Sequence, residues 1–322
     1  MAIQTLLKTT VGAVALVASV NAWAWPERPI TLVVPWPPGG GVDAAARVAA
    51  PLLSKELGQQ VIVLNRPGAT GSVGADHVAK ADPDGYTLLW SSLTTHAAHA
   101  ALYNPTNFDL EKSFKPVSVF GNIPFVIVTN PKVDASSLSE LVALAKSKPG
   151  SLTYASSGNG SVQHLAGEVF KQRADIDMLH VPYKGIGPSL VDLMGGQVNM
   201  SIESLAATLA HIQSKKLRPL AVATSERVSL LPDVPTAAEA GVKDFDVSTK
   251  LFAVAPANTP DEVVAKLDQA FKTVFSNKTL QDTLIAQSII TQYTSPEDSA
   301  AVIRDELASF RAVIKQAGIK PE

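Results

Sequence analysis

The sequence predicts an α/β protein made of two units, each with a largely parallel sheet covered by helices on both faces. Short apolar runs alternate with longer helical stretches along most of the 322 residues, which is the rhythm of βαβ units. The short runs are continuously apolar rather than alternating, as expected for strands buried on both faces. The rhythm begins again after FVIVT at residues 125–129, so we expect two units of similar construction.

In the first unit the pattern predicts the order strand, helix, strand, helix, strand. ITLVV at residues 30–34 is the first strand, and residues 43–57 form the first helix. VIVL at residues 61–64 is the second strand, and small residues over 74–80 form a helix that packs closely. TLLW at residues 87–90 is the third strand. Apolar runs of this length, bounded by turn residues, are typical of buried strands.

The second unit repeats this order and marks several helix starts. Ser137 and Glu140 have capping-box spacing, and Pro188 suits the first turn of a helix. Four strands and one further helix are expected from the apolar runs: strands at 152–156, 178–181, 198–202 and 220–223, and a helix at 162–173.

The C-terminal quarter contains a strand followed by helices. FAVAP leads into a helix for which Thr259 is the expected cap, with Pro260 in the first turn and Glu262 closing the capping box. Ser295 and Pro296 begin the last helix in the same manner.

No long Ser/Gly linker, charge block or low-complexity segment separates the two units, so the boundary must consist of structured crossings. We expect two crossing strands, around residues 122–129 and 248–255. Domain 1 then comprises residues 25–124 and 250–322, and domain 2 comprises residues 125–249.

The N-terminus reads as a cleaved signal peptide covering residues 1–24. A lone Lys8 precedes an apolar run at residues 11–20 and the small-x-small triplet that ends at Ala24. A membrane span needs about 20 apolar residues, roughly twice this run. We expect cleavage after Ala24 and a mature chain in the periplasm without membrane insertion.

Composition excludes several classes of function. The chain has 27 Lys and Arg against 29 Asp and Glu, a net charge of −2, and loss of Lys8 leaves 26 against 29, or −3. No positive field therefore recruits nucleic acid or acidic lipid. The absence of cysteine excludes disulfides, thiolate nucleophiles and Cys-ligated metal sites.

The first strand ends in a segment with unusual backbone demands, VPWPPGGGVD at residues 34–43. Prolines stiffen the end of the strand, and Gly39, Gly40 and Gly41 permit conformations closed to other residues. The N–H groups that open the next helix have no intrahelical partners, so an anion can bind there without Lys or Arg. A tight turn with Asp43 as an ordinary helix cap is the alternative.

The same order of strand, Gly-rich loop and helix recurs in the second unit, in ASSGNGSVQHLAGE at residues 155–168. Ser157, Asn159 and Ser161 add neutral hydrogen-bonding groups to this loop. NRPGATGSVGAD and HVPYKGIGPSL also lead into helices. Such loops gather at the carboxyl ends of the strands, where open α/β sheets bind ligands.

Enzyme motifs are weak in these loops. Gly68, Gly71 and Gly74 have the spacing G-x-x-G-x-x-G, which does not match the dinucleotide-binding fingerprint, and no phosphate-binding P-loop is present. A serine hydrolase that pairs Ser157 or Ser161 with His164 remains an alternative, although no G-x-S-x-G elbow surrounds either serine.

We expect neither a metal nor a cofactor. His96 and His99 lie three residues apart without a nearby acidic ligand, which makes a poor metal site. Thr94, Thr95 and His96 follow the strand at 87–90, so they are expected to line the cleft instead.

Three further side chains are candidates for ligand contact. Trp36 and Tyr183 lie in Gly-rich loops and suit a platform for the carbon skeleton of a ligand, or else burial against the sheet. Glu203 directly follows a strand, where it accepts a hydrogen bond from the ligand or caps the next helix.

The chain resembles the Bug-type (TctC) periplasmic substrate-binding proteins of tripartite tricarboxylate transporters. The resemblance covers essentially the whole mature chain and depends on these motifs in order: WPERPITLVVPWPPGGGVDAAAR, LGQQVIVLNRPGATGSVGAD, DGYTLL, KPGSLTYASSGNGSVQHLAGE, HVPYKGIGPSL, GGQV, LRPLAVAT and LPDVPTAAEAG.

The resemblance implies a type II periplasmic binding-protein fold, with a carboxylated ligand enclosed between two α/β domains. It also implies that backbone amides, hydroxyls and ordered water hold the carboxylate more than arginine does. The residues expected to face the ligand are Trp36, Gly39, Gly40, Gly41, Asp43, Thr70, Ser91, Ser92, Thr95, His96, Ser157, Asn159, Ser161, Gln163, His164, Tyr183, Gly187 and Glu203.

The function predicted from these residues is that of a non-enzymatic monomeric receptor. It captures a small di- or tricarboxylate or an aromatic carboxylate and presents it to the membrane subunits of a transporter. A sensory module that presents the same closed shape to a membrane histidine kinase remains an alternative from another class.

Overall fold

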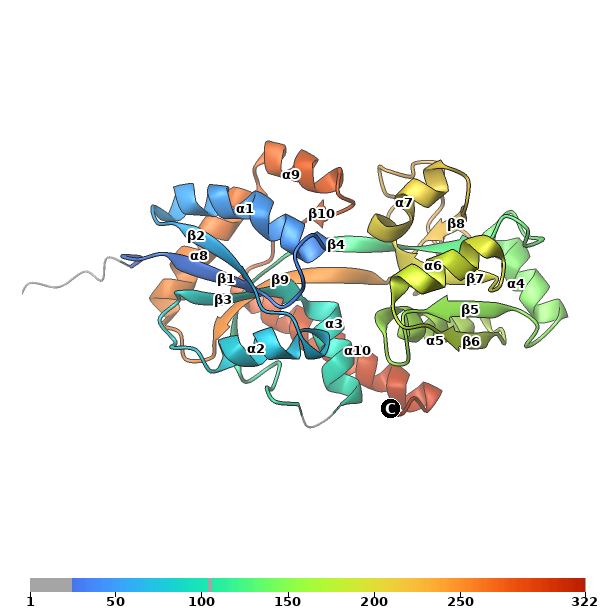
Figure 1. Cartoon of the computed structure of the whole chain (residues 1–322), viewed down its shortest axis with the longest axis horizontal. Coiled ribbons are helices and arrows are strands. Elements are labelled where there is room, and N and C mark those ends of the chain that lie inside the picture. The colour runs from blue at the N-terminus through green and yellow to red at the C-terminus, as the bar shows by residue number, and fades with distance from the viewer. Residues whose placement is uncertain (1–24, 104–105, 322) are drawn as a thin grey trace, which may run out of the picture.

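The computed structural model describes residues 25–103 and 106–321, and it consists of two lobes with strands that run from one into the other (Figure 1). The predicted signal peptide and its cleavage after Ala24 lie outside the described residues. Within the described part of the chain, no helix has the length and apolar character needed to cross a membrane.

The first lobe contains the N-terminal elements and most of the C-terminal ones. They are β1 (Ile30–Val34), α1 (Gly41–Leu57), β2 (Val61–Asn65), η1 (Ala69–Gly71), α2 (Ser72–Ala79), β3 (Thr87–Ser92), α3 (Leu93–Leu102), α8 (Asp261–Phe275), α9 (Lys278–Ile285), β10 (Ile290–Thr291) and α10 (Pro296–Ala317). The predicted strands and helices of this unit are present, with shifts of a few residues at their ends.

The second lobe contains the middle of the chain and repeats the same style. It comprises α4 (Leu138–Ser147), β5 (Thr153–Ser156), α5 (Val162–Ala174), β6 (Leu179–Pro182), α6 (Ile186–Gly195), β7 (Met200–Ser204), α7 (Leu205–Gln213) and β8 (Arg218–Val222). The fold class predicted from the sequence is thereby confirmed.

Two long strands, β4 (Phe114–Thr129) and β9 (Ser248–Pro256), join the lobes. They pair antiparallel over most of their length and carry the chain across near Ile123 and Thr249, which are register partners. This crossing falls in the two segments predicted for it. The strand order is β2-β1-β3-β9-β4-β7-β5-β6, with β8 and β10 also paired to β4. Outer strands pair in parallel, whereas the central strands pair antiparallel, which the apolar pattern alone did not reveal.

Strand β4 begins at Phe114, eight residues before the crossing segment predicted at residues 122–129. Its register shifts between Pro116 and Ser118 and again between Val119 and Gly121. Bulges of this kind insert an extra residue and break the two-residue side-chain period. The periodicity therefore concealed the first half of the strand.

Most predicted helix starts are confirmed. Ser137 accepts a hydrogen bond from the N–H of Glu140, Ser161 from that of His164, and Ser295 from that of Asp298. The expected capping box at Thr259 and Glu262 is wrong, because helix α8 begins at Asp261 and the Thr259 hydroxyl donates to the Pro256 carbonyl instead. Helix α6 begins at Ile186, two residues before Pro188.

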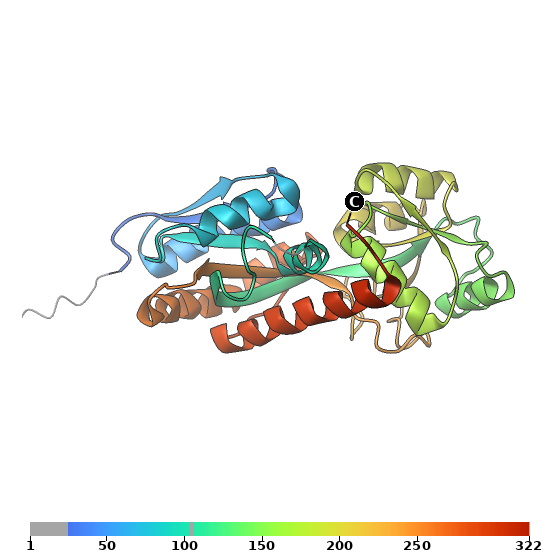
Figure 2. The same cartoon turned by 90° about the horizontal axis from the view of Figure 1, so that it is seen from below.

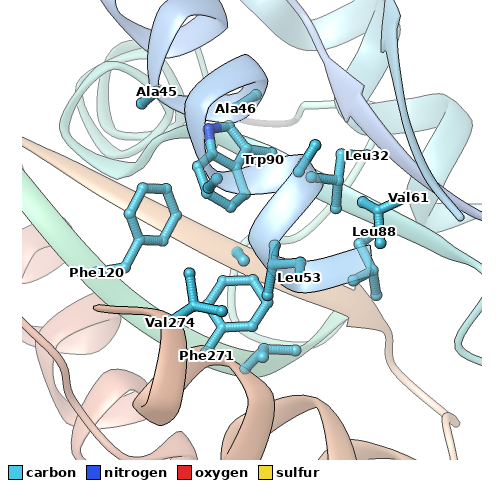
Figure 3. Close-up of a cluster of buried hydrophobic side chains, with 14 of the residues drawn as sticks. Leu32, Ala45, Ala46, Leu53, Val61, Leu88, Trp90, Phe120, Phe271 and Val274 are labelled. Carbon is cyan, nitrogen blue, oxygen red and sulfur yellow. The ribbon is translucent and has the colours of Figure 1, made fainter. Parts of the chain in front are cut away.

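Large aromatic residues hold the first lobe together. Trp90 on β3 packs against Phe120 on β4, with ring centroids 4.0 Å apart, and against Phe271 on α8 (Figure 3). Helix α1 covers them, and the indole Nε1 of Trp90 donates to the Val42 carbonyl at 3.1 Å. Burial of one such side chain contributes on the order of 2–3 kcal/mol. This core fixes the end of β3, from which α3 extends toward the second lobe.

Helix α10 connects the two lobes on the side shown in Figure 2. Ile303 and Leu307 belong to a core cluster of the first lobe. One to two turns further along, Phe310 packs against this cluster and also against the core of the second lobe, and Val313 packs against the second-lobe core. Lys250 on β9 fixes the middle of the helix through an ion pair with Glu306 at 2.7 Å. The sequence assigns residues 250–322 to domain 1. The last turns of α10, within that range, nevertheless contact domain 2.

Candidate functional site

A cavity of about 430 Å³ lies where the two lobes face one another. It is lined by residues of both lobes and of the crossing strands: Trp36, Thr70, Thr95, Ala98, His99, Tyr103, Ile123, Phe125, Ser157, Gly158, Asn159, Gly160, Ser161, Val162, Gln163, Ile186, Ser204 and Thr249. Two other hollows are at least as large, but each has several charged side chains around it, among them Lys146 and Asp175 in one and Glu226 and Arg227 in the other. The cavity between the lobes is the one toward which the Gly-rich loops converge.

The second lobe contributes the loop between β5 and α5 together with a chain of hydrogen bonds behind it. The Ser157 hydroxyl donates to Oε1 of Gln163 at 2.9 Å, and Nε2 of Gln163 donates to Oε1 of Glu203 at 2.9 Å. The N–H of Ser204 donates to the same oxygen at 2.8 Å. Glu203 therefore lies directly behind three residues that line the cavity and holds the amide of Gln163 in one orientation.

Glu203 itself does not reach the cavity. Its side chain is fully buried, and Oε2 has no hydrogen-bond partner among the described residues. Burial raises the pKa of this carboxyl to about 7, although the hydrogen bonds from Gln163 and Ser204 oppose the shift. A buried carboxylate with one oxygen that accepts no hydrogen bond has a high free energy, so a substantial fraction of Glu203 is protonated at neutral pH.

Histidine rings support the same loop from beneath. His164 Nδ1 accepts a hydrogen bond from the N–H of Gly160 at 3.0 Å, and the His164 ring stacks on that of His180 with centroids 3.8 Å apart. The Ser161 hydroxyl accepts from the backbone of His164 and does not bond to its ring.

The serine-hydrolase alternative therefore finds no Ser–His pair at Ser157 or Ser161. Ser156 does share a hydrogen bond with His180 Nε2 at 2.6 Å, but Ser156 is fully buried and cannot meet a substrate. A nucleophile needs both a base and access.

The glycine loop of the first lobe, residues 39–41, lies beside the cavity, and the carboxylate of Asp43 binds the backbone of this loop. Asp43 is 2% exposed, and its Oδ2 accepts from the N–H of Gly39 and from Nε of Arg47, both at 2.9 Å. Oδ1 accepts from Asn65 at 2.8 Å. Burial alone would raise the pKa of Asp43, but the hydrogen bonds from Arg47, Gly39 and Asn65 hold this pKa below its usual value. Asp43 thus binds the loop from within the first turn of α1, but it is not the helix cap expected in the alternative, because the N-cap residue is Gly40.

Trp36 projects from this loop into the cavity lining, where its indole Nε1 is buried and finds no hydrogen-bond partner in the part of the chain that the structure describes. Gly71 makes room for the ring, because a Cβ there would lie 3.1 Å from Trp36 and 3.0 Å from His96. The positive φ of 86° at Gly71 also favours glycine. The ring therefore has a fixed place at the edge of the cavity.

Helix α3 supplies one wall. Thr95, His99 and Tyr103 recur every four residues and line the cavity along one face of the helix. His96 points the other way, is fully buried and shares a hydrogen bond with Ser91 at 2.9 Å. Burial lowers the pKa of His96 to about 3, so its ring is neutral at physiological pH.

Of the residues predicted to face a ligand, the structure brings seven together around the cavity: Trp36, Thr70, Thr95, Ser157, Asn159, Ser161 and Gln163. The others lie behind or beside it: Gly39, Gly40, Gly41, Asp43, Ser91, Ser92, His96, His164, Tyr183, Gly187 and Glu203. Tyr183, for example, donates its hydroxyl to Asp192 at 2.8 Å.

Sequence reasoning missed several of the lining residues, namely Ala98, His99, Tyr103, Ile123, Phe125, Ser204 and Thr249. The spacing of Thr95, His99 and Tyr103 was a readable signal for one helix face. Ile123, Phe125 and Thr249 lie on the crossing strands, and nothing in the sequence shows which of their faces meets the cavity.

The cavity contains no Asp, Glu, Lys or Arg among its lining residues. His99 is the basic group there, and burial lowers its pKa, which favours the neutral ring. No group of three His, Cys, Asp or Glu residues in the described part of the chain is arranged to hold a metal ion. Hydroxyls, amides and the N-terminal turn of α5 are the polar groups present, and Ile123, Phe125 and Ile186 provide an apolar side.

Comparison with known proteins places this geometry in a family. Residues 45–319 match the family model described as tripartite tricarboxylate transporter family receptor, TctC. Protein BugT of Bordetella pertussis is 38% identical over 306 residues, which cover 95% of this chain and 94% of that protein.

Solved structures agree with this match. The R. palustris protein Rpa4515 with adipate is 34% identical with a TM-score of 0.79, and the match covers 92% of this chain and 100% of that one. MatC from Rhodopseudomonas palustris with bound malate is 31% identical with a TM-score of 0.74, over 90% of this chain and 100% of that one. The chain belongs to the TctC family of tripartite tricarboxylate transporter receptors.

Proposed function

We propose that this chain is a periplasmic receptor that captures an organic acid with one or two carboxylates on an apolar body. The observation that carries this proposal is the cavity between the lobes, which has hydrogen-bonding groups on one side, apolar walls on the other and no charged lining residue. The solved relatives with adipate and with malate support the choice of a carboxylate.

In this proposal the carboxylate binds at the second-lobe loop. The polar groups that converge there are Ser157, Asn159, Ser161 and the first peptide N–H groups of α5. The N-terminus of this 13-residue helix also carries a partial positive charge. The apolar body of the acid then lies against Trp36 and Tyr103 on the first lobe. A tricarboxylate is disfavoured, because no cation balances its extra charges in a confined cavity.

The remaining assignments follow from the family. We propose that the receptor acts as a monomer, binds no cofactor, performs no reaction, and hands its ligand to the membrane subunits of a tripartite transporter. The division into domain 1 at residues 25–124 and 250–322 and domain 2 at residues 125–249 is part of this proposal, with the lobes closing about β4 and β9. The family match favours transport over the sensory alternative.

The test is a melting screen followed by calorimetry on the mature chain with benzoate, adipate, malate and citrate. A ligand at 100 times its Kd stabilises the protein by about 2.7 kcal/mol. We expect citrate to give the smallest shift of the four. The absence of a shift with all of these acids contradicts the proposed function.

Two charge variants on one helix locate the site. Ile186 on α6 lines the cavity, whereas Val191 on the same helix is 63% exposed and lies outside the lining. Ile186→Glu brings a negative charge to the bound acid and is expected to weaken binding about tenfold or more. Val191→Glu adds the same charge elsewhere and is expected to leave the Kd unchanged. Equal effects of the two variants contradict the placement of the ligand.

A further inference from the structure

We propose that Glu203 takes up a proton when an anionic ligand enters the cavity, so that the receptor captures an organic acid together with one proton. This inference rests on the proposed function and adds a second ligand, the proton, at a site behind the cavity wall. The proton comes from solvent and binds Oε2 of Glu203, and no other bond forms or breaks.

The geometry leaves one carboxylate oxygen free for the proton. Oε1 of Glu203 accepts from Gln163 Nε2 at 2.9 Å and from the N–H of Ser204 at 2.8 Å, so it must stay unprotonated. Oε2 is buried and has no hydrogen-bond partner within residues 25–103 and 106–321. A proton on Oε2 removes a bare buried charge and leaves both existing hydrogen bonds intact.

The surrounding elements offer no compensating cation. Strand β7 packs against β4, β5, α5 and α7. Their ionisable side chains are Lys115 on β4, Tyr154 on β5, His164, Glu168, Lys171 and Arg173 on α5, and His211 on α7. Burial, Gln163 and Ser204 are the influences on the ionisation of Glu203, and none of these ionisable groups is among them.

Glu203 is poised to respond near neutral pH. Burial raises its pKa to about 7 before any anion arrives. Gln163 and Ser204 bind Glu203 on one side and line the cavity on the other, so an anion held there lies one side chain away from the carboxyl group. A like charge at such range disfavours ionisation and raises the pKa further.

The sign of the coupling follows from linkage. The complex binds more protons than the free receptor at pH values between the two pKa values of Glu203, so affinity for the anion falls as pH rises through about 7. The slope reaches up to tenfold per pH unit in that window, because one proton is exchanged.

Calorimetry with adipate and with benzoate, in phosphate and in Tris buffer at about pH 7.5, measures this proton directly. The two buffers release different heats of ionisation, so the difference in binding heat gives the number of protons taken up. We expect about half a proton per ligand in the unaltered chain and none in Glu203→Gln. We also expect the Kd of Glu203→Gln to be flat between about pH 6.5 and 8.5, whereas that of the unaltered chain rises about tenfold.

Two controls separate Glu203 from other groups. Glu168→Gln removes a carboxyl of the same lobe that bonds Tyr154 and Lys171 and does not line the cavity, so proton uptake is expected to persist. His99→Gln removes an imidazole that lines the cavity, so its Kd is expected to change, but the number of protons taken up per bound ligand at about pH 7.5 is expected to persist. Loss of uptake in His99→Gln assigns the proton to that ring and overturns the proposal.

The unaltered chain alone can also refute the inference, even where Glu203→Gln does not fold. Binding of adipate or benzoate with equal heats in both buffers means that no proton is taken up. That outcome overturns the role of Glu203 and leaves the receptor function standing. Failure of the whole acid panel to bind is the separate result that contradicts the function itself.

Discussion

Substitution of Gly160 by alanine tests whether the lobes must approach as the structure shows. Gly160 lies in the second-lobe loop with a φ of 71°, and a Cβ there would lie 2.2 Å from Cδ2 of Leu102, at the end of α3 in the first lobe. Left-handed backbone costs a non-glycine residue roughly 1–2 kcal/mol. Overpacking against a buried side chain adds about 1–3 kcal/mol. The sum is about 2–5 kcal/mol, and only its second part depends on how close the lobes are.

The two parts have different signatures. The backbone part lowers the free energy of unfolding, which urea denaturation measures. The contact part disfavours the approach of the lobes, so calorimetry with adipate should show affinity reduced about tenfold or more. Leu102→Ala in the same chain makes room for the new methyl group and is expected to restore most of the affinity without restoring the backbone cost.

Gly195→Ala is the matched control, because its Cβ would meet no atom within 4 Å and it lies in a helix. This variant should be as stable as the unaltered chain or slightly more so. If Gly160→Ala binds adipate as tightly as Gly195→Ala does, the lobes need not touch at Leu102 for capture, and the reasoning fails.

Three further predictions concern the scaffold. Gly167→Ala places a Cβ 2.2 Å from the fully buried Tyr154 ring and should lower the free energy of unfolding by about 3 kcal/mol, as measured in urea. Burial lowers the pKa of His96 to about 3 in the folded protein, whereas its pKa in the unfolded chain is about 6.5. Below about pH 6.5 the unfolded chain therefore binds a proton that the folded protein does not. The contribution of His96 to the free energy of unfolding is complete above about pH 6.5 and declines as the pH falls below that value. Unfolding free energies should therefore drop by about 2 kcal/mol from His96 alone between pH 7.5 and pH 5, and a His96→Asn chain should lack this component. Phe310→Ala removes packing of α10 on both lobes and should cost about 1–2 kcal/mol, with a larger radius of gyration in small-angle scattering if α10 holds the lobes together.

Much of the fold could be predicted because its signals are local. Apolar runs such as Ile30–Val34 become strands, and Ser161 and Ser295 cap helices where their neighbours place them. The start of β4 could not be predicted in this way, because bulges near Pro116 and Gly121 break the period that identifies a strand. Pairing between β4 and β9 joins residues more than 100 positions apart, so no local pattern encodes it.

The candidate site divides along the same line. The Ser157–Gln163 loop was predictable, because a strand, small polar residues and a helix follow one another along the chain. The glycine loop at residues 39–41 gave a similar signal, yet Asp43 lies four residues after Gly39 and occupies its N–H. The same helix-start chemistry can bind a ligand or a side chain of the protein itself. Only the three-dimensional structure shows which of the two occurs.

The arrangement of the lobes also restricts how the cavity can open. Strands β4 and β9 cross on one side, and α10 runs across the junction with its middle fixed by Lys250 and Thr94 through Glu306. Because Phe310, Val313 and Ile314, beyond Leu307, pack on the second lobe, separation of the lobes must either shear these contacts or detach them. A rotation about the crossing strands that slides Phe310 over the second-lobe core preserves most of its apolar burial, whereas detachment exposes it. We therefore expect opening to be a small shear at α10 coupled to a larger displacement across the cavity that Trp36 of the first lobe and Ile186 of the second lobe line.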